Sequence, residues 1–449
     1  ANAYADVLGL HADPEVQRSI GKRLAKTFED ELGDITKAEE TYKYVLSVDA
    51  LEVDALANLD RIYLSLESWP ELAGILEQRV KATQDTLELV DLYARLGEIY
   101  EMKLAQIDDA VRSWRRIFDD LDKANDGAIQ ALARIYASTE KWPELNVVYE
   151  RELENASGDV AEAEIRAKLA RLASDRLGDP HRAIETWKKV LDLRGEDAEA
   201  LGALANLYDG LEMWRELVEV LEREFEIAPS DDERVNILTR RARIFSDKLQ
   251  KDDVALEDWN RVLDIDYANL AALRSICQIR RRQNDASELV QALHQTVDRA
   301  TNFLDSEELK EIFRELGRTY QQVLQQPFDA ADAWRKMLEI GADWEGFDAL
   351  EHIYSSEERW TDVIDVKMQR AAAIEDPAQK IEELRAVAAI WTDTLAEPDS
   401  ATLAYQTILE ADPTNDEAFT ELERRHNDAA RWEPLVELYL GRLDTRTET

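Results

Sequence analysis

The fold of this chain is decided by the stretch LYARLGEIY at residues 92–100, which is followed by DAVRSW at 109–114 and KWPEL at 141–145. This pattern returns six times along the 449 residues, at an interval of about 73 residues. Self-similarity at a fixed interval is typical of repeat architectures, in which each unit buries its apolar face against its neighbours. The sequence therefore predicts a chain of six equivalent modules.

Three sets of residues mark this interval. Each module has an alanine four residues before an aromatic residue; the alanines are Ala38, Ala110, Ala183, Ala255, Ala330 and Ala401, and the aromatics are Tyr42, Trp114, Trp187, Trp259, Trp334 and Tyr405. A second tryptophan follows at Trp69, Trp142, Trp214, Trp360 and Trp432, and module four has Ala286 in its place. A small residue precedes both, at Ala25, Gly97, Ala170, Ala242, Gly317 and Ala388. Periodic aromatics indicate core positions, and the small residues would let two antiparallel helices approach closely.

The apolar residues within each module recur at helical spacing, and no segment alternates as a strand would. Short breaks with turn residues, such as GDP at 178–180, separate the helical segments. In the second module we expect four helices at about 85–104, 107–120, 125–139 and 142–156. The sequence therefore predicts an all-α protein.

The pattern Y-x-x-L-G-x-x-Y at residues 93–100 resembles the W-x2-L-G-x2-Y opening of the tetratricopeptide repeat. Residues 313–320 match equally well, and Ala401, Tyr405 and Pro413 resemble the A, F and P that follow in that motif. The resemblance implies an α-solenoid superhelix of about twelve helix pairs, two per module. The sequence departs from the family in the turn of each module's first pair, which is one residue longer. A weaker likeness, at residues 147–153, is to the half-TPR (HAT) repeats of RNA-processing scaffolds.

The repeat register predicts the domain boundaries. Residues 1–12 align with the end of a preceding repeat helix, and the modules occupy 13–84, 85–158, 159–230, 231–304, 305–376 and 377–449. No Pro/Gly/Ser-rich linker interrupts the register, so we expect one continuous solenoid. Solenoids normally finish in atypical, polar capping units, and neither end of the sequence has one. We therefore expect the chain to be a piece of a longer array.

The formal charge of −41, from 96 acidic and 55 basic residues, limits the possible partners. Nucleic-acid binding depends on Lys and Arg contacts to phosphates, so this charge argues against nucleic acid and equally against an anionic membrane surface. The sequence contains no run of about 18 apolar residues, so we expect no membrane insertion. We expect a soluble protein, with cytoplasm and periplasm both left open. The sequence does not indicate an oligomeric state.

No pattern of catalytic residues is recognisable. The five histidines are His11, His181, His294, His352 and His426, and none belongs to an H-E-x-x-H motif. No G-x-S-x-G or P-loop pattern occurs, and the single cysteine, Cys277, excludes an internal disulfide framework and a cysteine-based metal cluster. We therefore expect no enzyme activity in this chain, and no catalytic, cofactor-binding or metal-binding residues.

Module four is where the repeat pattern fails, because Arg241 and Arg280 replace an apolar and an aromatic residue of the pattern. The module is also rich in arginine, and its net charge of −1 contrasts with −41 for the chain. The family resemblance implies that the first helix of each pair lines the concave groove. Four residues would then face it, namely Arg243, Arg274, Gln278 and Arg281. Guanidinium groups suit carboxylate recognition, so this surface could bind an acidic segment; the alternative is pairing with carboxylates of neighbouring modules.

Trp344 lies off the repeat pattern, near the start of a helix, and could be exposed. Exposed tryptophans are favoured at binding hot spots, which makes Trp344 a candidate partner-binding residue, although a local packing role is equally compatible with the sequence.

The leading functional hypothesis is a non-catalytic scaffold that binds basic or extended segments of other proteins along the concave face. The structural alternative is a spacer within a very large cell-envelope or motility protein. The enzymatic alternative is a targeting array for a catalytic domain outside this sequence. An RNA-processing scaffold of the half-TPR type fits the charge least well.

Overall fold

The computed structural model describes residues 13–447, with the side chains described up to residue 443. The predicted helix end at residues 1–12, and His11 with it, lie outside the described residues. Over residues 13–447 the chain forms 24 α-helices and no strand, so the predicted all-α class is confirmed. The residues divide into two compact units, 1–227 and 228–449, which we describe separately.

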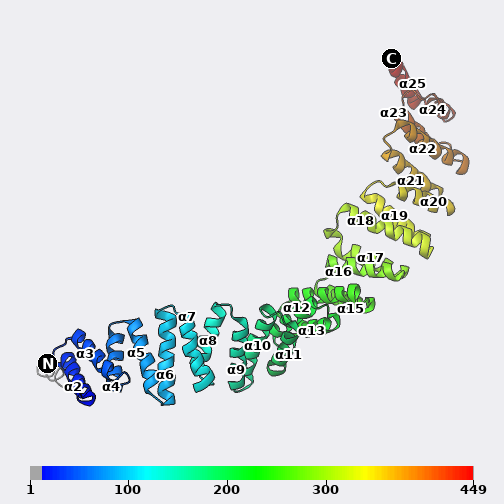
Figure 1. The fold of residues 1–449 in the computed structure, drawn as a ribbon. Helices are drawn as coiled ribbons and strands as arrows, with labels where there is room; N and C mark the ends of the chain where they lie inside the picture. Colours follow the sequence, from blue (N-terminus) through cyan, green and yellow to red (C-terminus); the bar gives the residue numbers. More distant parts are fainter. Residues whose placement is uncertain (1–12, 448–449) are drawn as a thin grey trace. The chain divides into compact units, whose positions relative to one another are not determined.

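The first unit contains twelve α-helices within its described residues. Their bounds are α2 Pro14–Lys26, α3 Ile35–Val48, α4 Val53–Ser65, α5 Trp69–Ala82, α6 Thr86–Glu98, α7 Ile107–Arg116, α8 Asp126–Ser138, α9 Trp142–Asn155, α10 Asp159–Asp175, α11 Pro180–Arg194, α12 Ala198–Gly210 and α13 Trp214–Ile227. Consecutive helices such as α5, α6, α7 and α8 pack side by side in chain order (Figure 1). The even-numbered helices are the first of each pair, and the odd-numbered helices are the second.

The second unit repeats this arrangement over its described residues. Its helices are α14 Asp231–Arg243, α15 Asp252–Ile265, α16 Leu270–Gln283, α17 Ala286–Ala300, α18 Ser306–Arg318, α19 Pro327–Ile340, α20 Trp344–Ser356, α21 Trp360–Ala373, α22 Pro377–Ala389, α23 Thr402–Ala411, α24 Asp416–Asp428 and α25 Trp432–Thr447. A short 3-10 turn, Thr301–Phe303, follows α17. Within each unit the chain reverses direction after every helix, which gives the stacked hairpins expected of helical repeats (Figure 1).

Side chains that precede the helices satisfy their first backbone amides. Asn125, Asn269 and Asn415 each accept a hydrogen bond from the backbone amide three residues later, at 3.0 Å. A capping side chain of this type stabilises a helix by about 1 kcal/mol. The helices therefore begin where the turn residues of the repeat predict.

The extra residue in each module's first hairpin is taken up by a widened helical turn. A π-helical turn ends the first helix of five modules, at Thr27–Glu31, Ile99–Lys103, Ile244–Lys248, Thr319–Leu324 and Ile390–Thr394. In module two, the amide of Leu104 donates to the carbonyl of Ile99 at 3.0 Å. The third module keeps α-geometry to Asp175, yet the amide of Leu177 reaches back to Leu172 with the same spacing, at 3.0 Å. The longer turn thus stays hydrogen-bonded.

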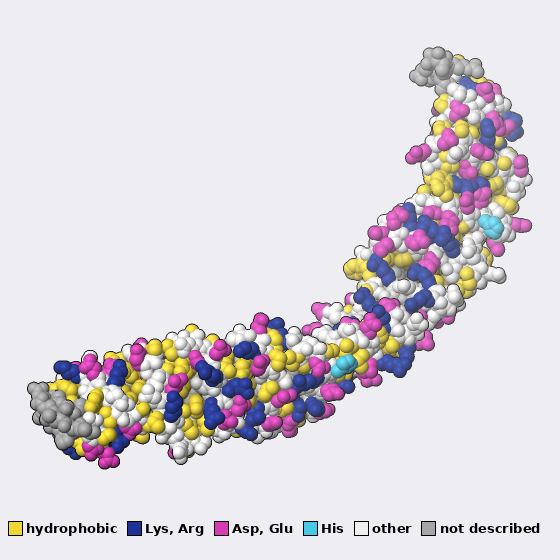
Figure 2. Space-filling model, in the orientation of Figure 1, with side chains coloured by type: hydrophobic (Ala, Val, Ile, Leu, Met, Phe, Trp, Pro, Cys, Tyr) yellow, Lys and Arg dark blue, Asp and Glu magenta, His cyan; other side chains and the backbone are white. Residues whose placement is uncertain are grey.

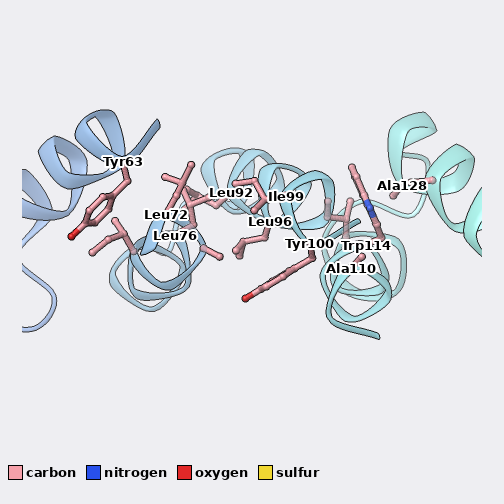
Figure 3. Packing of buried hydrophobic residues seen from close by; sticks show 14 of the residues in the cluster. Tyr63, Leu72, Leu76, Leu92, Leu96, Ile99, Tyr100, Ala110, Trp114 and Ala128 are labelled. Atoms are coloured by element: carbon pink, nitrogen blue, oxygen red, sulfur yellow. The ribbon is translucent and has the colours of Figure 1, made fainter. Parts of the chain in front are cut away.

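The small residues of the repeat make room for the aromatic ones. A Cβ atom at Gly317 would lie 2.5 Å from the indole of Trp334, and one at Gly97 would overlap the indole of Trp114. Both indoles are buried, as are those of Trp187 and Trp259. In Figure 3, Leu72 and Leu76 of α5 point toward the apolar side chains of α6, and Trp114 of α7 lies beside α8. Tyr42 is buried as well, whereas Tyr405 is half-buried, so the first set of periodic aromatics is core except at Tyr405.

The second set of tryptophans is less buried than a core assignment predicts. Trp69 and Trp142 are half-buried, and each lies under a cation from the end of the next module's first helix. Lys103 Nζ is 4.7 Å from the Trp69 ring, and Arg176 is 4.9 Å from the Trp142 ring. Trp432 is 61% exposed, because α25 is the last described helix and no described helix packs over it. The core prediction was therefore wrong for Trp432 and holds only in part for Trp69 and Trp142.

Candidate functional site

The first helices of neighbouring pairs are joined by ion pairs along one face of each unit. In the first unit, Arg95 of α6 donates to Asp60 of α4 at 2.8 Å, and Arg134 of α8 pairs with Glu101 at 2.8 Å. In the second unit, Arg318 of α18 pairs with Glu345 of α20 at 2.6 Å. Figure 2 shows basic and acidic side chains interspersed over the drawn surface. We call the surface that the first helices form in each unit, where these ion pairs lie, the first-helix face.

Two of the predicted site residues take part in these ion pairs. Arg274 of α16 pairs with Glu308 of α18 at 2.5 Å, and Arg281 contacts both carboxylate oxygens of Glu315 at 2.6 Å. The hydrogen bonds that Arg281 donates to Glu315 raise the pKa of Arg281 above its ordinary value. An acidic ligand at this place would have to displace Glu308 and Glu315. The geometry therefore matches the alternative in which these arginines pair with neighbouring modules.

The remaining predicted residues are not brought together with these arginines. Arg243 and Gln278 are exposed on α14 and α16, and no ion pair joins Arg243 to a carboxylate among the described residues. Trp344 begins α20 and is 55% exposed, and its ring centroid lies 6.0 Å from that of Phe347. The five residues therefore form no single pocket in the described part of the chain.

The arginines that break the repeat in module four have internal partners. Arg241 donates through Nε to the fully buried Asp258 of α15 at 2.9 Å, and Arg280 pairs with Glu288 at 2.9 Å. Burial raises the pKa of Asp258, while the charge and hydrogen bond of Arg241 act in the opposite direction. Two charged residues thus replace apolar packing, and the altered pattern has a structural explanation in this module.

An open groove lies on the first-helix face of modules one and two, a surface that the sequence reasoning did not single out. Its volume is about 480 Å³. We call it the Met102 groove, and it is lined by Leu64, Trp69, Leu72, Arg95, Glu98, Ile99, Met102, Lys103, Trp114, Gly127, Gln130, Ala131 and Arg134. These residues come from five successive helices, α4 to α8, and from the π turn after α6. The groove therefore depends on the stacking of three first helices.

The wall of the Met102 groove is apolar, and its rim is mostly basic. Leu64 is 50% exposed and Met102 62% exposed. Arg95 and Arg134 have carboxylate partners, whereas Lys103 lies over the Trp69 ring. The groove can therefore bury apolar side chains of a ligand while cations remain at its edge.

A signal for this groove was present in the sequence. At the position of Leu64 the other modules carry Ala137, Asp209, Arg281, Ser355 and Asn427, and at the position of Met102 they carry Asp30, Asp175, Asp247, Gln322 and Asp393. Two apolar residues at positions that are small or polar in the other modules mark the groove. Reading the departures from the repeat, rather than the repeat alone, would have found it.

Within residues 13–447 no group of three or more His, Cys, Asp or Glu side chains could hold a metal ion. No α-helix of that range has the length and apolar composition needed to cross a bilayer.

Comparison with known proteins adds a family assignment for one segment. Residues 200–235 match the tetratricopeptide repeat model, so the predicted resemblance is confirmed. No curated protein matches the chain. A chain of the structure of Naa15/Naa10 bound to HypK-THB is similar over 94% of this chain and 62% of its own length, less than two thirds, with 13% identity and a TM-score of 0.39.

Two smaller solved structures are similar over part of the chain. YrrB, described as a TPR protein with an unusual peptide-binding site, shares 18% identity over 42% of this chain and 91% of its own, with a TM-score of 0.27. MamA shares 18% identity over 38% of this chain and 89% of its own, with a TM-score of 0.28.

Proposed function

We propose that this tetratricopeptide-repeat chain is a non-catalytic scaffold that binds an extended segment of another protein in the Met102 groove. The observation that supports the proposal is the groove itself, in which Leu64 and Met102 expose apolar surface between three stacked first helices. Exposed apolar side chains in a concave site with a polar rim are typical of peptide recognition.

The charge of the groove rim favours a segment that combines apolar and acidic residues. Lys103 is exposed, and no ion pair joins it to a described carboxylate. A ligand carboxylate could therefore reach it without displacing an internal partner. This proposal differs from the predicted preference for basic segments, which rested on the overall charge of −41.

The proposal is tested by site-specific photocrosslinking in the native source. A benzophenone amino acid replaces Met102 in one variant and Leu87 in a control variant. Leu87 is 82% exposed on α6 but does not line the groove. We expect discrete crosslinked proteins at position 102 that are absent at position 87. These crosslinks should disappear when Leu64→Asp is added, because a carboxylate would lie in the apolar wall.

Two results would contradict the proposal. One is the same set of crosslinked proteins at both positions, and the other is crosslinking at position 102 that survives Leu64→Asp in a folded protein. Circular dichroism and thermal melting of each variant serve as the folding control. The predicted acidic-segment surface at Arg243, Arg274, Gln278 and Arg281 is tested separately, by the binding of the same partners to Arg274→Glu and Arg281→Glu variants. The separate candidate Trp344 is tested by a Trp344→Ala variant.

A further inference from the structure

A second groove lies between α5 and α7, on a different face of α6 from the Met102 groove. Its volume is about 410 Å³. We call it the Lys81 groove, and it is lined by Glu77, Val80, Lys81, Tyr93, Leu96, Tyr100, Asp109, Arg112, Ser113 and Arg116. Tyr93, Leu96 and Tyr100 form one stripe of the first helix and its π turn, whereas Arg95, Glu98 and Met102 of the Met102 groove form another. The two grooves are therefore separate surfaces.

The basic residues of the Lys81 groove outnumber its carboxylates, by three to two. No ion pair joins Lys81 to a carboxylate among the described residues, and Arg112 pairs with Asp109 within the groove. Arg116, the last residue of α7, pairs with Asp120 of the following π turn at 2.5 Å, and both side chains are exposed. Glu77 accepts a hydrogen bond from the hydroxyl of Tyr100 at 2.8 Å. The ammonium of Lys81 is thus open to an external anion.

The repeat shows that two of these charges are unusual. At the position of Lys81 the other modules carry Glu154, Glu226, Asp298, Ala372 and Asp444. At the position of Arg112 they carry Glu40, Glu185, Glu257, Asp332 and Leu403. Each junction between modules thus combines one residue of each set. At each junction the two residues are of the same type, both basic, both acidic or both apolar.

Module junctions elsewhere pair two acids, as in Glu154 with Glu185 and Asp298 with Asp332, or two apolar residues, Ala372 with Leu403. The junction of modules one and two alone pairs two bases, Lys81 with Arg112. Like charges that line one groove repel each other, and a stable fold does not require them. Acidic residues are compatible with the fold at these two positions, so folding alone does not account for Lys81 and Arg112.

A related groove in the second unit has the opposite charge. It lies between α19 and α21, has a volume of about 230 Å³, and contains Arg335 with Glu339, Asp362 and Asp365 among its lining residues. Both grooves have a first helix as their floor and second helices as their walls. This groove lies within module five and not at a junction between modules, and it shows that grooves of this kind can carry either sign of charge.

We propose that the Lys81 groove binds an acidic peptide segment, with a ligand carboxylate held between Lys81 and Arg112. Val80 on the α5 wall and Tyr93 on the α6 floor are both half-buried and offer apolar surface to a neighbouring aliphatic side chain of the ligand. Burial, followed by the hydrogen bond to Glu77, raises the pKa of Tyr100 to about 12, so its hydroxyl stays protonated beside the bound segment. This site does not depend on the partner proposed for the Met102 groove.

The test uses a fluorescein-labelled peptide of alternating Glu and Leu residues and measures its binding by fluorescence anisotropy. The variants Lys81→Glu and Arg112→Glu give the groove the acids found at other junctions, so they are expected to fold. Each should weaken binding about tenfold or more, the equivalent of losing one close charge pair. Binding to the unchanged protein should also weaken as the salt concentration rises.

The matched control is Lys189→Glu, which makes the same change of charge at an exposed residue of α11 outside the groove. Its effect should be less than about twofold, because a distant surface charge is largely screened. Because this peptide also combines apolar and acidic residues, as does the segment proposed for the Met102 groove, every measurement is repeated in a Leu64→Asp background. The losses caused by Lys81→Glu and Arg112→Glu should persist there, since Leu64 does not line the Lys81 groove. Equal weakening by Lys189→Glu and Lys81→Glu would overturn the proposal. So would unchanged binding in folded Lys81→Glu and Arg112→Glu variants, or an oligonucleotide of equal charge that binds as tightly as the peptide.

Discussion

The first-helix face of modules one and two differs from the same face of modules four and five, although both use equivalent helices. Between α4 and α8, Leu64 and Met102 leave an open apolar groove. Between α16 and α20, Arg281 occupies the place of Leu64 and pairs with Glu315. The repeat therefore determines the positions of the side chains. Residues that differ from their counterparts in other modules determine whether the first-helix face has an open groove or is covered by ion pairs.

The largest expected effect comes from removing the buried indole that both regions share. Trp114→Ala and Trp334→Ala should each destabilise their module by about 3–5 kcal/mol, because each indole is buried over a glycine. Hydrogen exchange should show protection lost first in the adjacent helices, since a solenoid unit contacts mainly its neighbours. Trp344→Ala, at an exposed position, should cost less than about 1 kcal/mol. Similar losses for all three variants would contradict this packing.

A smaller effect is expected at the glycines under these indoles. Gly97→Ala and Gly317→Ala should each cost about 1–3 kcal/mol through overpacking, measured by urea unfolding. The double variant Gly97→Ala with Trp114→Tyr should recover part of this loss, because tyrosine has the smaller ring and modules one and six carry alanine with tyrosine. Modules three and four combine alanine with tryptophan, so the helices can also adjust, and the loss should lie at the low end of this range. If the double variant recovers none of the stability lost in Gly97→Ala, the indole of Trp114 does not determine how closely α6 and α7 approach.

The ion pairs of the second region should contribute less to stability than the packing does. Arg281→Met should destabilise the protein by up to about 1 kcal/mol, because both partners are partly exposed. The loss should shrink as the salt concentration rises from low to moderate. Lys103→Met in the first region removes a cation over Trp69 and no ion pair, so its effect should depend less on salt. Equal salt dependence of the two variants would remove this distinction between the faces.

The smallest effect concerns pH. Burial tends to raise the pKa of Asp343, but the hydrogen bonds from Arg314, at 2.7 Å, and from the amide of Gly346 outweigh it and lower the pKa below its ordinary value. Asp343 therefore stabilises the fold above the pKa of the unfolded carboxyl, about 3.9, and this contribution is lost as pH falls through the lower folded value.

The Asp343→Asn variant should have a free energy of unfolding lower by about 1 kcal/mol or less at neutral pH. The decrease of this free energy between about pH 5 and pH 2 should also be smaller in the variant than in the unchanged protein. Urea unfolding at several pH values measures both quantities. If the free energy of unfolding falls equally with acidification in the variant and in the unchanged protein, the Asp343 carboxylate does not stabilise the fold through its charge.

Much of the fold could be predicted because helical periodicity and the repeat interval are both properties of the sequence. The expected helix at 142–156 corresponds to α9, Trp142–Asn155, and the expected helix at 125–139 to α8, Asp126–Ser138. The proposed module boundaries and the single continuous solenoid stay predictions. Burial of the second tryptophan set was overestimated, because periodicity alone cannot distinguish a core residue from one that lies half-buried under a lysine or arginine.

The candidate site was harder to predict from the sequence. The arginines of module four were conspicuous because they are unusual, yet their partners Glu308 and Glu315 lie 34 residues away in the chain and become visible only in the structure. The Met102 groove and the Lys81 groove depend on single residues that differ from their counterparts in other modules. A comparison of modules with one another, position by position, could have indicated both.

The π turns at the ends of the first helices have a consequence for how such an array can change length. The turn of Ile99–Lys103 absorbs a residue inside the hydrogen-bonded helix, so the following helix α7 still begins in its proper place. A one-residue insertion or deletion at this point need not be looped out or shift the stacking of later modules. Hairpins with and without the widened turn can therefore alternate within one module, as the pairs α6–α7 and α8–α9 do, and each hairpin can vary independently of its neighbours.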